Sequence, residues 1–228
     1  MKALYWKLRE LDPRRYLWQV RRAVLLVRLR LLATWYHASV EVDLAPDLRL
    51  GRRLRIELLP DSTNVLRVGP SSLIGDDVRL MLKGGEILMG ERTQIRHGST
   101  LNVSGRFELQ DGAVIGYQCF VHCAESVVLE PLAGLAELVT IADSSHYFTT
   151  PDAWFYENVR TAPVRIGANT WLCPRVSVAS GVTIGSHCII AANSLVTKPV
   201  PDGQVASGVP IDSLRELPLR WRRKQQTA

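Results

Sequence analysis

The sequence of 228 residues predicts a mainly β protein in which short parallel strands stack as the coils of a solenoid. Three observations predict it. Aliphatic residues recur every six positions in the second half of the chain, and a fixed repeat of this kind is typical of solenoids. The first 36 residues instead follow a helical period. The six-residue period is interrupted between about Leu129 and Val164, which predicts a protruding loop.

The helical segment is expected to break at Asp12-Pro13 and to continue to about residue 36. Arginines recur at seven-residue spacing on one face, and aliphatic residues follow another face. The arginines are Arg14/Arg15, Arg21/Arg22 and Arg28, and the aliphatic residues are Leu17, Val20, Val24 and Val27. Two interpretations remain open. The aliphatic stripe packs on the rest of the domain with solvated arginines, or the helix lies at an anionic lipid surface or an acidic substrate.

The six-residue period is clearest from residue 166 onward, where every sixth residue is aliphatic. These residues are Ile166, Leu172, Val178, Ile184, Ile190 and Val196. The fourth residue after each is small or β-branched, and these are Thr170, Val176, Val182, Cys188, Ser194 and Val200. Earlier runs follow the same period: Leu109, Ile115, Val121 and Val127, and, offset by two residues, Met89, Ile95, Leu101 and Phe107. The offset predicts a bulge or turn near Phe107-Glu108. The inward residues of stacked coils form one continuous core.

The four cysteines are Cys119, Cys123, Cys173 and Cys188. Their spacing contains no CxxC pair and matches neither a zinc site nor a disulfide framework. Cys119 and Cys188 fall at inward small positions of the repeat. We therefore expect buried, reduced thiols and no metal.

Charge divides the chain into three segments. Residues 1–55 carry 13 Lys and Arg against 5 Asp and Glu, residues 56–211 carry 10 against 15, and residues 212–228 carry 5 against 2. We expect a basic helical segment over 1–55, a repeat domain over 56–211 with its loop at 129–163, and a basic tail over 212–228. The basic residues are not accompanied by aromatic or groove-reading motifs, which argues against nucleic-acid binding. We see no signal peptide and no run of about 20 apolar residues that could span a membrane, which predicts a cytoplasmic protein. The basic helix is then the candidate site of peripheral contact with an anionic membrane.

Aromatic residues gather in the interruption of the repeat. They are Tyr147, Phe148, Trp154, Phe155 and Tyr156. A long loop that leaves a regular scaffold is usually functional or disordered, and this aromatic content argues against disorder. Tyr147, Trp154 and Tyr156 are the expected substrate-binding residues.

The late repeats resemble the hexapeptide-repeat acyltransferases, and within them the galactoside, maltose and colanic-acid acetyltransferases. The motifs, in order, are Val164-Arg-Ile-Gly-Ala-Asn-Thr-Trp-Leu-Cys-Pro, Gly181-Val-Thr-Ile-Gly-Ser-His, Ala192-Asn-Ser-Leu-Val-Thr-Lys and Ala206-Ser-Gly-Val-Pro. The resemblance covers roughly residues 70–215. It implies a left-handed parallel β-helix of triangular coils and a homotrimer. It also implies that acetyl-CoA and the acceptor meet between adjacent subunits.

The resemblance implies that a histidine near the interruption is the catalytic base. Histidine suits this role because its pKa lies near the working pH. Many relatives carry Asp-His-x-His, whereas Ser144 stands at the first histidine position here and leaves His146 as the base. Asp143 either orients this imidazole, binds the acceptor or forms a turn. His122, beside inward Val121, is the reserve.

For acetyl-CoA, the resemblance implies contacts from the late coils and from basic residues near the C-terminus. The matching residues are Trp171, Ala192, Thr197, Lys198 and Arg215. Two departures weaken individual contacts. Cys173-Pro174 follows Trp171-Leu172 where relatives have glycine, and Asp212 replaces a basic residue after Gly-Val-Pro.

The predicted function is therefore acetyl-CoA-dependent O-acetylation of a saccharide, as in a polysaccharide or glycolipid precursor. The alternative is an N-acyltransferase acting on an amino sugar or small amine. A metal-dependent hydratase of the same fold is excluded, because the His-x4-His pair of such a zinc site is missing. A purely structural β-helix would not need the aromatic loop.

Overall fold

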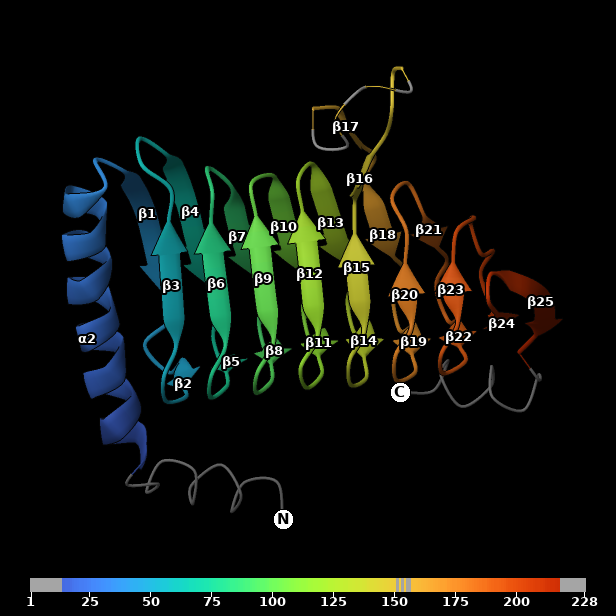
Figure 1. Ribbon diagram of the computed structural model, residues 1–228. Coiled ribbons are helices and arrows are strands. Elements are labelled where there is room, and N and C mark those ends of the chain that lie inside the picture. The colour runs from blue at the N-terminus through green and yellow to red at the C-terminus, as the bar shows by residue number, and fades with distance from the viewer. Residues whose placement is uncertain (1–13, 151, 153, 155–156, 218–228) are drawn as a thin grey trace, which may run out of the picture.

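The computed structural model describes residues 14–150, 152, 154 and 157–217. Over these residues the chain forms a parallel β-solenoid of about seven turns with one N-terminal helix. Figure 1 shows the coils stacked side by side, with helix α2 (Arg14–Trp35) at one end and a hairpin rising from the stack. The mainly β solenoid predicted from the six-residue period is confirmed.

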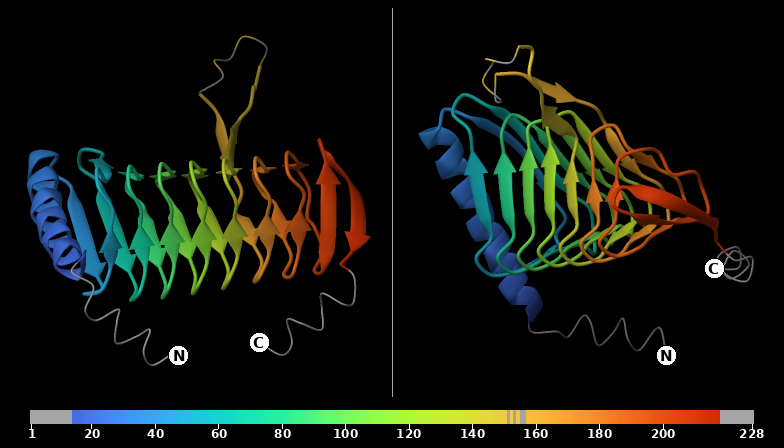
Figure 2. Two further views of the ribbon diagram at one scale, coloured as in Figure 1. Left: turned by 90° about the horizontal axis from the view of Figure 1, so that it is seen from below. Right: turned by 45° about the vertical axis from the view of Figure 1, so that its right-hand side comes forward.

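Three sheets form the sides of the solenoid (Figure 2), and each regular coil adds one parallel strand to each of them. The exception is the end of the second sheet, where β25 pairs antiparallel with β24. The first sheet contains β1 Ser39–Leu44, β4 Thr63–Val68, β7 Glu86–Met89, β10 Arg106–Leu109, β13 Ser126–Leu129, β18 Val164–Ile166 and β21 Thr183–Ile184. The second contains β2 Arg49–Leu50, β5 Leu73–Ile74, β8 Gln94–Ile95, β11 Val114–Ile115, β14 Gly134–Leu135, β19 Trp171–Leu172, β22 Ile189–Ile190, β24 Gln204–Gly208 and β25 Ile211–Glu216. The third contains β3 Arg55–Leu58, β6 Arg79–Leu82, β9 Thr100–Val103, β12 Phe120–Cys123, β15 Thr140–Ala142, β20 Ser177–Val178 and β23 Leu195–Val196.

The interior is a set of aliphatic ladders along the solenoid axis. All six aliphatic residues of the late repeat are buried, as are the small residues four positions after each of them. The early runs that end in Val127 and Phe107 are buried too. These patterns correctly identified the core.

The early coils are longer than the late ones. Arg106 pairs with Ser126, twenty residues on, whereas Arg165 pairs with Thr183, eighteen residues on. The two extra residues lie where the third sheet turns into the first, as at Ser104-Gly105 between β9 and β10. The bulge expected near Phe107-Glu108 is thus a longer corner a few residues earlier.

The solenoid begins inside the segment assigned to the basic helix. Helix α2 ends at Trp35, and β1 pairs with β4 from Ser39 onward. The six-residue period did not reveal the first coil, because this coil is longer: Ser39 pairs with Thr63, 24 residues away. At the other end, the first residues of the expected tail (212–216) belong to β25 (Ile211–Glu216), which is antiparallel to β24. Within 129–163, β14 and β15 keep regular coil positions, so only about residues 143–162 project.

Helix α2 lies across the first coil and contacts β1, β2 and β3 (Figures 1 and 2). Its buried side chains are Leu25 and Leu29, whereas Leu17, Val20, Val24 and Val27 are exposed. The expectation that this aliphatic stripe packs on the domain is therefore wrong, although the helix itself does pack on the first coil. The helix has two apolar faces, and arginines beside the inner one bond to the first coil. No helix in the described ranges combines the length and apolar character needed to cross a membrane.

Phe107 is the largest fully buried side chain of the core, so Phe107→Ala should lower the free energy of unfolding by about 3–5 kcal/mol. Phe120, which is 41% exposed on the outer side of β12, provides the control. Phe120→Ala should cost less than about 1 kcal/mol. Urea denaturation of both variants measures the difference, and equal losses would contradict the inward position of Phe107.

Candidate active site

The interruption of the repeat is an antiparallel hairpin of β16 (Ser144–His146) and β17 (Val159–Thr161). It leaves the solenoid at the corner between the third and first sheets, after β15 and before β18, and stands out from the coils (Figure 2). Arg160 Nε donates to Ser145 Oγ at 3.0 Å, and the Tyr147 amide donates to the Asn158 carbonyl at 3.1 Å. The hairpin is thus an ordered extension of one coil.

Asp143 fastens the root of this hairpin. Its buried carboxylate accepts hydrogen bonds from the backbone amides of Ala124, Glu125 and Ser126 at 2.7, 2.8 and 2.9 Å. Its carbonyl accepts from the Ala162 amide at 2.8 Å and the Ser180 hydroxyl at 2.9 Å. These bonds tie the preceding coil, the hairpin and the following coil together. They favour the turn-forming role of Asp143 over acceptor binding.

His146 ends β16, three residues after Asp143, and is exposed. Tyr147, Phe148 and Trp154 follow it on the same projection, each exposed by more than a third of its surface. The structure therefore brings His146, Tyr147 and Trp154 into one segment. Tyr156 lies outside the described residues.

His122 lies on the outer side of the third sheet, near the same corner. It is half-buried on β12, and its register partner on the next coil is Ala142, the last residue before Asp143. Its Nδ1 lies 3.0 Å from Nδ2 of Asn102 on the previous coil. An asparagine amide offers both a donor and an acceptor, so Asn102 can fix the ring of His122 in either neutral tautomer. Sequence reasoning missed Asn102 because its place beside His122 depends on the twenty-residue coil length.

Trp171 stands on β19 of the second sheet, the side of the triangle opposite the hairpin corner. It is 44% exposed, and its ring covers Gly134 so closely that a Cβ there would lie 2.5 Å from a ring carbon. Within one chain, Trp171 and His146 therefore lie on different sides of the solenoid.

The other residues expected to contact acetyl-CoA lie on the last coils. Thr197 and Lys198 are exposed just after β23, at the corner from which the hairpin also rises. Ala192 lies in the turn after β22, and Arg215 is exposed on β25, where it pairs with Val205. The structure thus gathers Lys198 and the hairpin on one corner of the solenoid, while Ala192 and Arg215 belong to other parts of the final coils.

The cysteines are free thiols that do not contribute a reactive thiolate. Burial raises the pKa of Cys119 to about 11, and burial together with the Asp143 carboxylate raises that of Cys123 to about 12. Burial also raises the pKa of Cys173 and Cys188. Among the described residues, no group of three or more His, Cys, Asp or Glu side chains is arranged to hold a metal ion.

Comparison with known proteins identifies the repeat. Residues 163–198 match the family described as "Bacterial transferase hexapeptide (six repeats)". The "Probable acetyltransferase Rv3034c" of Mycobacterium tuberculosis is 24% identical over 75% of this chain and 51% of its own length. Galactoside O-acetyltransferase of Escherichia coli is 46% identical over 24% of this chain and 27% of its own length. The chain thus spans about half the length of the first relative and less of the second.

A solved structure shares the fold. It is AntD of Bacillus cereus, an N-acyltransferase in complex with dTDP and 3-hydroxybutyryl-CoA, with a TM-score of 0.54 and 14% sequence identity. The likeness covers 88% of this chain and 93% of AntD. The comparisons confirm the resemblance to the hexapeptide-repeat acyltransferases.

The raised thiol pKa values predict slow alkylation of the folded protein. At pH 8, a thiol with a pKa of about 11 is about 10⁻³ ionised, and the thiolate is the reacting form. Iodoacetamide should therefore label Cys119, Cys123 and Cys188 at least tenfold more slowly in the native than in the urea-unfolded chain, as measured by peptide mass spectrometry. Cys173, which is half-buried, is the internal comparison. Rapid native labelling of Cys123 would contradict its buried position.

Proposed function

We propose that this chain transfers an acetyl group from acetyl-CoA to a hydroxyl group of a saccharide, with His146 as the general base. The observation that carries the proposal is the hairpin that bears His146 and exposed aromatic side chains on a hexapeptide-repeat solenoid. The relatives described as acetyltransferases support the reaction class.

The proposed reaction is a direct transfer between the two substrates. The acceptor oxygen attacks the thioester carbonyl, the new C–O bond forms, and the C–S bond breaks. His146 takes the hydroxyl proton, which then passes to the leaving CoA sulfur, so no other reactant is required. Buried cysteines with raised pKa values are poor nucleophiles, which favours this direct route over an acyl-cysteine intermediate.

The role of Asp143 in this proposal is to position the hairpin. Because three backbone amides occupy its carboxylate, it fixes where β16 leaves the solenoid and hence where His146 stands. Tyr147 and Trp154 offer flat apolar faces of the kind that sugar rings contact. His122, held by Asn102 at the foot of the same corner, remains the reserve base.

The exposed groups of the last coils suit a CoA thioester. Trp171 offers an exposed ring for the apolar pantetheine arm, with a glycine beneath it. Lys198 and Arg215 are exposed cations that can pair with phosphates, and Thr197 is an exposed hydroxyl beside Lys198. These residues fit the donor without a metal ion.

We further propose a homotrimer with sites shared between neighbours. Trp171 and His146 lie on opposite sides of one protomer, so a site that uses both needs two protomers. Cyclic packing of three triangular solenoids can bring the second sheet of one copy to the hairpin corner of the next.

An N-acyltransferase acting on an amino sugar is the second candidate. The observation that favours it is the fold shared with AntD, an N-acyltransferase whose crystal structure is a complex with dTDP and 3-hydroxybutyryl-CoA. The same hairpin can deprotonate an ammonium group of the acceptor. Release of free CoA with matched hydroxyl and amino sugars separates the two functions.

His146→Asn should lower kcat by about 10² to 10⁴, because asparagine cannot accept the acceptor proton. KM for acetyl-CoA should change little. The matched control is His187→Asn, since His187 is an exposed corner residue with a left-handed backbone that asparagine tolerates. Full activity in His146→Asn together with loss in His122→Ala would assign the base to His122 instead.

If each active site takes Trp171 from one subunit and His146 from its neighbour, two inactive variants should restore activity when they are combined in one trimer. Trp171→Ala should raise KM for acetyl-CoA, and His146→Asn should abolish the proton transfer. In a cyclic trimer that contains both variants, one site in three combines an intact Trp171 with an intact His146. Co-expression with two affinity tags should therefore restore activity in the doubly tagged fraction, measured at acetyl-CoA concentrations below KM. A doubly tagged fraction no more active than the separate variants would rule out sharing between Trp171 and His146.

A further inference from the structure

The inner face of helix α2 caps the free end of the solenoid. Leu25 and Leu29 are buried against the first coil. Beside them, the guanidinium groups of Arg21, Arg22 and Arg28 donate hydrogen bonds to backbone carbonyls of that coil, each at 2.9 Å. The accepting carbonyls belong to Leu50, Leu44 and Leu54. Both kinds of contact fix how the helix is rotated about its own axis.

This rotation turns a continuous apolar stripe to the outside. We call it the outer stripe, and its exposed members are Tyr16, Leu17, Val20, Val24, Val27, Leu31 and Trp35. Their exposure ranges from 43% at Val20 to 79% at Trp35. The spacing of three and four residues keeps them on one side of the helix. An apolar stripe of this length with aromatic rings at both ends is typical of a surface that contacts another apolar phase.

The charge of the helix restricts what can cover the outer stripe. Residues 14–35 include six arginines and no acidic residue. A second copy of the helix laid along the stripe would bring two such cationic segments together without a counter-charge. An anionic surface instead complements both the stripe and the arginines that flank it.

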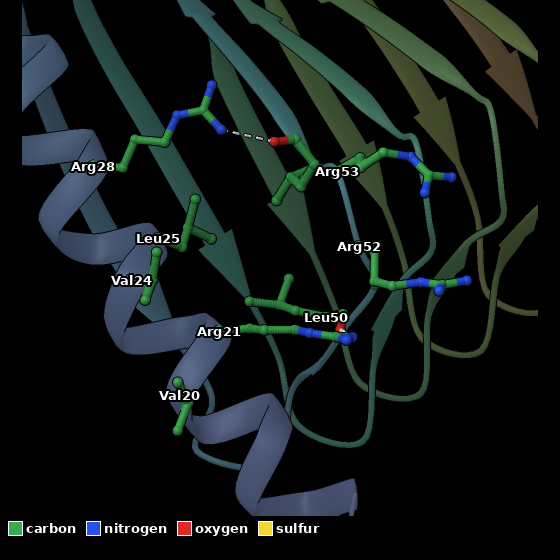
Figure 3. Close-up of a pocket in the computed structure, with 10 residues that line it drawn as sticks. Val20, Arg21, Val24, Leu25, Arg28, Leu50, Arg52 and Arg53 are labelled. Atoms are coloured by element: carbon green, nitrogen blue, oxygen red, sulfur yellow. Dashed lines mark hydrogen bonds between the residues drawn. The ribbon is translucent and has the colours of Figure 1, made fainter.

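A groove beside the outer stripe also favours an anionic partner surface (Figure 3). It has a volume of about 350 Å³ and runs between α2 and the turn from β2 to β3. Its apolar lining includes Val20, Val24 and Leu50, and its charged lining is Arg21, Arg28, Arg52 and Arg53. Arg52 and Arg53 pair with Asp76 and Asp77, so four cations face two carboxylates. Such a groove suits an acidic headgroup with the first part of its acyl chains.

We propose that helix α2 docks the protein on an anionic lipid bilayer. The outer stripe lies among the headgroups and upper acyl chains, and the groove arginines contact the phosphates. This attachment is independent of the proposed acyl transfer, because α2 and the hairpin are separated by several coils (Figure 1).

The test is flotation of the full-length protein with vesicles of phosphatidylcholine containing about 40 mol% phosphatidylglycerol. The wild-type protein should float with these vesicles, float at least tenfold less with pure phosphatidylcholine, and dissociate in part at about 0.5 M NaCl. Val24→Glu/Val27→Glu should reduce flotation at least tenfold, because it places two carboxylates in the outer stripe.

The matched control is Leu132→Glu/Leu138→Glu, which adds the same charge at two exposed corner positions of the solenoid. It should float as the wild type does. Circular dichroism and the melting temperature of Val24→Glu/Val27→Glu should match those of the control, since the substituted side chains are exposed. Point substitution is preferable to truncation, because a chain that starts near Asp43 lacks the helix cap and most of β1.

Three results would overturn the proposal. The wild-type protein could fail to float with anionic vesicles at low salt. The two glutamate variants could float equally well. Sedimentation could show that Val24→Glu/Val27→Glu has a smaller assembly than the control, which would identify the outer stripe as a contact between protein chains.

Discussion

The structure depends on one constraint: each coil must lie in hydrogen-bonded register on the coil before it. Adjacent strands in a sheet are about 4.8 Å apart, so each inward residue must fit on the residue of the preceding coil. Leu66, Ile87, Phe107 and Val127 form one such ladder of fully buried side chains along the first sheet. At the corners the backbones approach so closely that a Cβ on Gly105 would lie 2.3 Å from the Glu125 carbonyl oxygen. A change inside a coil therefore disturbs its neighbours on both sides.

Register also decides where the chain can carry additional residues. An insertion within a strand would move inward residues to the outside, whereas an insertion at a corner leaves every strand in place. The hairpin uses this freedom: β13 pairs directly with β18 and β15 with β20, as if residues 143–162 were absent. Asp143 closes the corner beneath the hairpin with three amide hydrogen bonds to the preceding coil. The proposed chemistry therefore sits on a rigid base although it leaves the regular repeat.

The same constraint explains what sequence analysis could and could not predict. Ile166 and its partners were recognised because eighteen-residue coils place equivalent side chains at an unbroken period of six. The coils of 20 to 24 residues break that period, so β1 and β2 were assigned to the helical segment. The left-handed backbones of Arg53, Arg92 and Gln118 were not predictable, since these residue types seldom signal such turns. For the site, the sequence predicted a protruding loop and proposed His146 within it as the base. The hydrogen bonds of Asp143 and Asn102 could not be predicted, because they depend on which coils are neighbours.

At the two ends of the solenoid, the strands of the last coil have no further coil to pair with. A parallel stack presents open strand edges, which promote association unless they are covered. β25 covers the C-terminal edge by pairing with β24, whereas α2 covers the N-terminal end through Leu25, Leu29 and three arginines. Because these arginines bond inward, the valines between them face outward, and the cap acquires a second apolar face. From β3 to β15 there are four strand spacings, so the hairpin corner stands about 20 Å along the axis from the capped coil. The end cap can therefore bind a surface while the hairpin stays open to an acceptor.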